Sequence, residues 1–247
     1  MDIHVLENAQ QLGEQAAAHA AVILQEAIDR QGKARLLLST GSSQFEFFKA
    51  LVAQPIDWSK VEMFHLDEYA GISDTHPASF QAYLQERFIR QVNLGGFHLV
   101  DGTGDLRSTI ARLNAAIQEA PVDLAMIGIG ENAHIAFNDP PADFDTEEPY
   151  IVVELDEACK RQQVGEGWFA GIEDVPTHAI TMSVRQILKS KVILSCVPHA
   201  VKAKAIRQTL NSEIAPNVPS TMLRTHPNWT LYLDRESAAQ TELAVKE

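Results

Sequence analysis

Two loop segments of the sequence contain the side chains that could carry chemistry. In the first, Asp67 directly follows an apolar stretch of strand length, residues 61–66. The second, residues 128–140, contains His134 and Asp139. A carboxylate and an imidazole at strand ends can exchange protons with a bound substrate, and a second carboxylate can orient the imidazole. These side chains predict acid–base chemistry. From the residues alone, the alternatives are that Asp67 caps a helix and that His134 is structural.

A short loop of small polar residues offers a place for an anionic group. Thr40, Gly41, Ser42 and Ser43 lie between an apolar stretch of strand length and a segment with a helical pattern. Backbone N–H groups and hydroxyls of such a loop can approach a phosphate at the positive end of a helix. The same residues also cap helices with no ligand present, so composition leaves both interpretations open. The loop has neither the Walker spacing nor the three-glycine dinucleotide pattern.

The segments between these loops predict alternating strands and helices. Apolar residues recur every three or four positions from Leu12 to Ala27, which predicts a long helix ending at Gly32. Strands are expected over residues 35–39, 61–66, 122–127, 178–182, 192–196 and 229–233, and further helices over 45–51, 80–89 and 200–210. The alternation predicts a single α/β domain over residues 1–247, Rossmann-like, with a doubly wound, mostly parallel sheet and helices on both faces. Ligands of such sheets bind outside the carboxyl ends of the strands.

Charge and cysteine content narrow the class of partner. The 247 residues include 33 acidic and 20 basic side chains, a formal charge of −13 that repels nucleic acid and anionic lipid. Cys159 and Cys196 lack the spacing of a redox pair or a metal knuckle, which predicts reduced thiols and no metal site. The first residues show no basic segment followed by an apolar one, so we expect a cytoplasmic location. A phosphate ligand would require basic groups concentrated locally.

Six stretches, taken in order, resemble the glucosamine-6-phosphate deaminase/isomerase family across nearly the whole chain. They are residues 39–43, 66–71, 76–80, 128–140, 174–176 and 223–227. The most specific combination is Asp-Glu-Tyr at residues 67–69 with His-Ile-Ala-Phe-Asn at residues 134–138. The resemblance implies a sugar-phosphate substrate, no metal and no organic cofactor. The sequence leaves the oligomeric state open, a homo-oligomer included.

The resemblance also assigns catalytic roles. Asp67 matches the family's proton shuttle between C1 and C2 of the sugar, and His134 matches the residue that opens the pyranose ring. Asp139 matches the acidic residue that assists this histidine. The implied reaction converts glucosamine 6-phosphate to fructose 6-phosphate and ammonia.

The same resemblance also assigns the residues that bind the phosphate. Ser42 and Ser43, beside Gly41, fall in the phosphate-binding loop. The family's two basic phosphate ligands are carried onto Arg161 and Lys202. A guanidinium and an ammonium together would supply the local positive potential that the acidic chain otherwise lacks.

Two departures from the family pattern concern the histidine. Asn132 stands where many members have Asp; an amide accepts hydrogen bonds but stabilises an imidazolium less than a carboxylate does. Asp139 replaces the usual Glu and is one methylene shorter. We therefore expect either a shifted loop or a bridging water between Asp139 and His134.

Further departures concern substrate choice. Ser183 and Arg185 stand where deaminases often have Gly, and residues 141–148 are acidic where allosterically activated relatives have basic residues. We therefore predict no activation by N-acetylglucosamine 6-phosphate. The alternative functions are an isomerase/deaminase of another hexosamine phosphate such as galactosamine 6-phosphate, a 6-phosphogluconolactonase, and a non-catalytic sugar-phosphate-binding protein. The lactonase pattern has Asp-Glu-Arg and His-Thr-Ala-Ser in place of residues 67–69 and 134–137.

Overall fold

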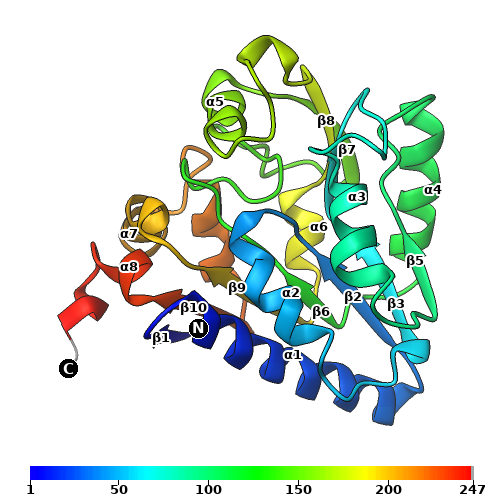
Figure 1. The fold of residues 1–247 in the computed structure, drawn as a ribbon, viewed down its shortest axis with the longest axis horizontal. Helices are drawn as coiled ribbons and strands as arrows, with labels where there is room; N and C mark the ends of the chain where they lie inside the picture. The colour runs from blue at the N-terminus through cyan, green and yellow to red at the C-terminus, as the bar shows by residue number, and fades with distance from the viewer. Residues whose placement is uncertain (246–247) are drawn as a thin grey trace.

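The structure is a computed structural model that describes residues 1–245. A seven-stranded parallel sheet forms its centre (Figure 1). The strand order is β1-β10-β9-β6-β2-β3-β5, and each neighbouring pair is parallel. The strands are β1 (Asp2–Leu6), β2 (Ala34–Leu38), β3 (Val61–His65), β5 (Gly96–His98), β6 (Leu124–Met126), β9 (Val192–Val197) and β10 (Trp229–Asp234).

Helices cover both faces of this sheet, as the sequence predicts. They are α1 (Ala9–Gln31), α2 (Phe45–Leu51), α3 (Phe80–Leu84), α4 (Leu106–Gln118), α5 (Glu157–Gly165), α6 (Val184–Leu188), α7 (Ala203–Asn211) and α8 (Arg235–Ala238). Strand β2 shows why apolar residues follow one another in a buried parallel strand. Leu36 and Leu38 pack with α1, α2 and α3, whereas Leu37 faces the core beneath α4, α6 and α7, because side chains alternate along a strand.

Local signals explain the limits of the longest helix. The side chain of Asn8 accepts a hydrogen bond from the N–H of Gln11 and caps the start of α1. Gly32 ends the helix with φ 80°, a left-handed conformation that glycine adopts without steric cost. The buried side of α1 carries Leu12, Ala16 and Leu24, so the predicted helical stripe is confirmed.

A second, smaller sheet is a departure from the predicted topology. It contains β4 (Asp67–Tyr69), β8 (His178–Met182) and β7 (Tyr150–Glu154), all antiparallel. The predicted strand over residues 178–182 exists, but it lies in this sheet and outside the parallel one. The chain passes from one sheet to the other at Leu66, whose N–H bonds Leu38 in the main sheet and whose carbonyl accepts from Met182. Asp67 therefore starts the second sheet, above the carboxyl ends of the parallel strands.

Other elements were not expected from the sequence, namely β1, β5, β7, α4, α5, α6 and α8. The predicted helix over residues 80–89 is α3 followed by a wider π-helical turn, Gln85–Ile89. Among the helices of the described chain, none combines the length and the apolar character needed to span a membrane.

Candidate active site

Most of the predicted site residues meet at one pocket at the carboxyl ends of the parallel strands. The loop after β2 contributes residues 40–43, β4 contributes Asp67, and the loop after β6 contributes His134. Lys202 enters from the turn after β9, and the segment that includes α5 closes the opposite side. The pocket therefore brings together a carboxylate, an imidazole, an ammonium and a loop of small residues.

Gly41 shapes the loop that precedes α2. It has φ 112°, a conformation that disfavours residues with a Cβ. Its carbonyl accepts hydrogen bonds from the hydroxyl of Tyr83 at 2.9 Å and from the N–H of Gln44. The side chain of Gln44 donates to the carbonyl of Cys196 at 2.9 Å, which ties the loop to β9. Ser42 and Ser43 thus line the pocket on a fixed backbone.

Asp67 presents a buried carboxyl group to the pocket. It is 5% exposed, and burial together with the adjacent Glu68 raises its pKa well above the ordinary value. A carboxyl group with a raised pKa takes up a proton at a higher pH than an ordinary Asp does. Asp67 is therefore suited to accept and return a proton.

Glu68 points away from the pocket and holds the neighbouring backbone. Its carboxylate accepts hydrogen bonds from Ser79 Oγ at 2.9 Å, from Gln81 N at 2.8 Å and from Phe80 N at 3.2 Å. Burial nevertheless raises the pKa of Glu68 to about 7. The two consecutive carboxylates thus have different tasks, because one faces the pocket and the other fixes the start of α3.

His134 stands on a tightly folded loop. The N–H of Gly130 bonds the carbonyl of His134 at 2.9 Å, and Ala133 and Ala136 both have positive φ, 67° and 52°. The imidazole lies directly over Gly130, where a Cβ would be 2.2 Å from Nε2. The glycine at residue 130 is therefore required by the position of the histidine ring.

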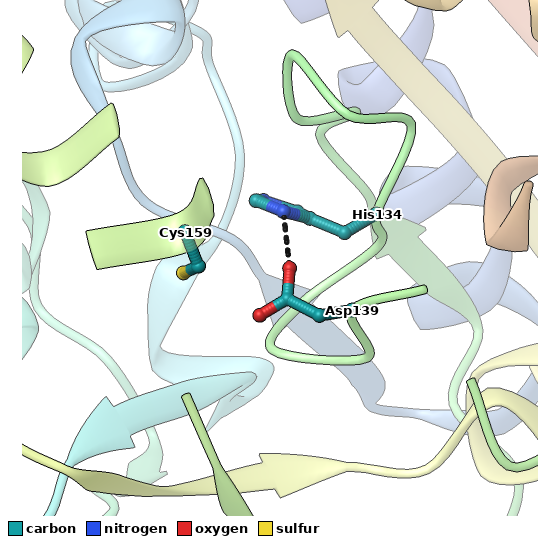
Figure 2. A group of neighbouring side chains, drawn as sticks. All are labelled: His134, Asp139 and Cys159. Atoms are coloured by element: carbon teal, nitrogen blue, oxygen red, sulfur yellow. Dashed lines mark ion pairs between the residues drawn. The ribbon is translucent and has the colours of Figure 1, made fainter. Parts of the chain in front are cut away.

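Asp139 reaches His134 directly, so neither a shifted loop nor a bridging water is needed. Its Oδ1 is 2.9 Å from Nδ1 of the imidazole (Figure 2). Burial opposes ionisation of Asp139, but His134 and a hydrogen bond from Asn132 outweigh it and lower the pKa of the carboxyl group. Asn132 joins the pair twice: its Nδ2 donates to Asp139 Oδ1 at 3.1 Å, and its Oδ1 accepts from the N–H of His134 at 3.1 Å.

Lys202 is the one Lys or Arg among the residues that line this pocket in the described part of the chain. It is 7% exposed, and burial lowers the pKa of its ammonium group, with Glu166 and Glu131 acting in the opposite direction. An anion bound beside it would compensate the buried positive charge.

The structure does not bring Arg161, the other basic residue assigned to the phosphate, into the pocket. Its side chain is 68% exposed, and Nη2 lies 2.6 Å from Oε2 of Glu157. The reason is the face of α5 that packs inward. Cys159 and Gln163 are buried, and Arg161 lies about 200° around the helix from each of them.

The same segment supplies pocket residues that the sequence did not indicate: Gln162, Gln163, Glu166 and Trp168. Glu166 accepts hydrogen bonds from Gln162 Nε2 at 2.8 Å and from Trp168 Nε1 at 3.0 Å. Gln162, Gln163 and Glu166 follow Cys159 at helical spacing, and this spacing could have predicted that they share one face of a helix.

Ser183 and Arg185 do not line the pocket either. Ser183 caps α6, since its side chain accepts from the N–H of Gln186. Arg185 binds the acidic segment instead, with Nη1 2.5 Å from Glu147 Oε1 and Nη2 3.6 Å from Asp145 Oδ1. Their departures from the family pattern therefore leave the pocket lining unchanged.

Comparisons with known proteins agree with this geometry. Residues 7–232 match the family model described as glucosamine-6-phosphate isomerases/6-phosphogluconolactonase. A glucosamine-6-phosphate deaminase of Lactobacillus delbrueckii subsp. bulgaricus is 35% identical over 240 residues, 97% of this chain and 99% of that protein. One of Streptococcus pneumoniae is 36% identical over 212 residues, 85% of this chain and 88% of that protein.

Solved structures give the same result for the fold. A monomeric glucosamine-6-phosphate deaminase superposes with a TM-score of 0.88 at 28% identity, covering 98% of this chain and 100% of that chain. A 6-phosphogluconolactonase of Thermotoga maritima superposes with a TM-score of 0.78 at 16% identity, over 94% and 98% of the two chains, and shows the fold alone. The chain belongs to the glucosamine-6-phosphate isomerase/6-phosphogluconolactonase family.

Proposed function

We propose that this protein is an enzyme that isomerises and deaminates glucosamine 6-phosphate to fructose 6-phosphate and ammonia. Relatives that are 35% and 36% identical over most of the chain bear the name of this activity. The observation that carries the proposal is the arrangement of Asp67 and the His134–Asp139 pair around one pocket. The arrangement offers two separate proton-transfer groups, and this reaction needs two.

The first step is opening of the pyranose ring. His134 removes the proton of the anomeric hydroxyl and delivers a proton to the ring oxygen, which gives the open-chain aldehyde. The imidazolium that forms in between is stabilised by Asp139, whose lowered pKa keeps it ionised. Asn132 holds both partners in place through its two hydrogen bonds.

The second step moves a proton between carbons. Asp67, as carboxylate, removes the proton from C2 and returns a proton to C1 through an enediol-type intermediate that carries nitrogen at C2. The resulting imine at C2 takes up water and releases ammonia, which leaves the ketone of fructose 6-phosphate. Proton transfer by a positioned group accelerates a reaction by roughly 10²–10⁴-fold. No step of this mechanism calls for a metal ion or an organic cofactor.

The phosphate of the substrate is bound by the loop of residues 40–43 and by Lys202. Ser42 and Ser43 line the pocket and offer hydroxyls and backbone N–H groups to a phosphate, and Lys202 adds a positive charge. Arg161 has no part in this proposal. The phosphate and the carboxylate of Asp67 then lie at different sides of one sugar, so that the charged end fixes the position of C1 and C2.

A substrate comparison tests the proposal. Purified protein is incubated with glucosamine 6-phosphate, galactosamine 6-phosphate or 6-phosphogluconolactone, and ammonia, fructose 6-phosphate and lactone hydrolysis are measured. We expect ammonia and fructose 6-phosphate in equal amounts from the first substrate. Preferential turnover of the galactosamine substrate or hydrolysis of the lactone would assign one of the other functions, and binding without turnover would indicate a sugar-phosphate-binding protein.

The cellular setting is part of the same proposal. We place the reaction in the cytoplasm, since the proposed substrate is a small charged metabolite and the formal charge of −13 on the chain repels anionic lipid.

A further inference from the structure

An imidazole, a carboxylate and a thiol lie close together at His134. His134 and Asp139 come from the loop after β6, and Cys159 comes from α5 (Figure 2). One nitrogen, one oxygen and one sulfur of these residues lie within 4.8 Å of one another. From the sequence, Cys159 was expected to be a reduced thiol outside any metal site, because its proximity to His134 exists only in the folded chain.

Two polar atoms of the cluster make no hydrogen bond. Nδ1 of His134 pairs with Asp139 Oδ1 at 2.9 Å, but within the described residues neither this nitrogen nor Asp139 Oδ2 has a hydrogen-bond partner. Cys159 is completely buried. Buried polar atoms without partners are uncommon in folded proteins and often mark a place where an ion or a ligand binds.

A second cluster in the protein shows the contrast. His199, Asp234 and Glu236 also lie close together, but both carboxylate oxygens of Asp234 already accept backbone N–H groups, from His199 and from Ser237. His199 and Glu236 are exposed to solvent. Both oxygens of Asp234 are therefore used in a helix cap, whereas Nδ1 of His134 and Oδ2 of Asp139 make no hydrogen bond within the described residues.

We propose that His134, Asp139 and Cys159 form an inhibitory binding site for a thiophilic divalent cation such as Zn²⁺. Zinc favours nitrogen and sulfur ligands, accepts a carboxylate, and commonly combines three protein ligands with one open position. Mg²⁺ and Ca²⁺ prefer sets made of oxygen alone and are excluded by the same chemistry. Ligand atoms of a tetrahedral zinc site are roughly 3.3–3.8 Å apart, given bond lengths of about 2.0–2.3 Å, so small side-chain rotations complete the site.

Metal binding here would block the catalytic pair. The cation takes the nitrogen of His134 that faces Asp139 and takes the carboxylate as well, so the imidazole loses the partner that stabilises its protonated form. The binding of metal is independent of the proposed function, whereas its inhibitory effect rests on it. The two parts are therefore tested separately.

Cobalt reports on the binding directly. Protein freed of metal by a chelator is titrated with Co²⁺, and we expect a thiolate-to-cobalt charge-transfer band that saturates at one equivalent and is displaced by Zn²⁺. The band should be lost in Cys159→Ser and retained in Cys196→Ser, the matched control, because Cys196 is the other buried thiol and lies in the core beside Leu194 and Tyr232. Absence of the band, or its survival in Cys159→Ser, would overturn the proposal.

A second variant guards against misfolding of the first. Asp139→Asn keeps the thiol and the imidazole, and we expect its affinity for Zn²⁺ to fall by at least about tenfold, the lower end of what even indirect partners of a metal contribute. Circular dichroism and the midpoint of thermal unfolding establish that each variant is folded. If Cys159→Ser does not fold, an unchanged Zn²⁺ affinity in Asp139→Asn would overturn the site by itself.

The inhibitory effect is measured with glucosamine 6-phosphate. We expect stoichiometric Zn²⁺ to suppress ammonia release by wild type and by Cys196→Ser, and a chelator to restore it. A cobalt band without any Zn²⁺ inhibition would retain the site and refute its inhibitory role. A protein that binds cobalt but never releases ammonia would instead refute the proposed deaminase activity.

Discussion

Two sides of the pocket are built in different ways. The catalytic cluster, defined as Asp67, His134 and Asp139, is positioned by backbone constraints: a strand that switches sheets at Leu66, and a loop with two alanines at positive φ. The α5 wall, defined as Gln162, Gln163 and Glu166, is positioned by the inward face and the C-terminal end of a helix and by side-chain hydrogen bonds to Glu166. We therefore expect substitutions in the cluster to change turnover more than substitutions in the α5 wall.

The largest effect should come from Asp67→Asn. The amide cannot accept the C2 proton, so turnover should fall by at least roughly 10²–10⁴-fold. Phosphate-dependent binding should stay within a few-fold of wild type, because the loop of residues 40–43 and Lys202 are untouched. Ammonia release and calorimetric binding of glucosamine 6-phosphate measure the two quantities. Substantial residual turnover would remove Asp67 from the mechanism.

Gly130→Ala should produce the next largest effect. The added Cβ would lie 2.2 Å from Nε2 of His134, so the ring must move, and displacement of a catalytic group by about 1 Å can cost roughly 10²-fold in rate. Gly96→Ala is the matched control, because a Cβ at Gly96 meets nothing within 4 Å. We expect kcat to fall in the first variant alone. Equal kcat values in both would show that the ring position is not critical.

Lys202→Met tests the phosphate side of the pocket. A hydrogen bond to a charged group contributes about 1.5–3 kcal/mol, which corresponds to roughly 10- to 150-fold in kcat/KM. Inorganic phosphate should inhibit wild type competitively and should inhibit the variant much less. Retained phosphate inhibition would place the anion elsewhere in the pocket.

The pH dependence of kcat/KM tests the raised pKa of Asp67. The carboxylate is the reactive form, so activity is lost as the pH falls through the raised pKa, and the acid limb should lie well above pH 3.8. Glu68→Gln removes the neighbouring charge and should move this limb to lower pH. Glu46→Gln, an exposed carboxylate paired with Lys49, is the control and should leave the limb in place. An acid limb near the ordinary Asp value in wild type would contradict the burial of Asp67.

The smallest effect is expected for Arg161→Ala. An exposed ion pair contributes about 0–1 kcal/mol, and this guanidinium pairs only with Glu157 in the described structure. KM and kcat should therefore stay within about twofold of wild type. A large rise in KM would mean that α5 rotates to bring Arg161 to the phosphate.

The sequence predicts the catalytic side of the pocket better than the α5 wall, for physical reasons. Buried parallel strands such as β2 carry apolar residues on both faces, and residues 67 and 134 follow strand-like segments, so their meeting at one sheet edge follows from topology. Arg161 was assigned to the phosphate by its place in a matched stretch. Which face of a short polar helix packs inward depends on tertiary contacts, and these favour Cys159 and Gln163.

The second sheet escaped prediction for a related reason. Strand β4 has three residues, Asp67–Tyr69, and all three are buried although two are acidic. No periodicity can be read from so short a segment. Its pairing with β8 arises from contacts distant in sequence, and the same is true of the direct contact between Asp139 and His134.

The most direct test of the mechanism is turnover of glucosamine 6-phosphate in D₂O, with the fructose 6-phosphate analysed by NMR. The account predicts ammonia release and deuterium in only one of the two hydrogen positions on C1. Product molecules without deuterium carry, at that same position, the hydrogen that Asp67 transferred from C2. A single fixed carboxylate reaches one face of the intermediate, so equal labelling of both positions would contradict the role of Asp67. Absence of both ammonia and fructose 6-phosphate would contradict the proposed reaction itself.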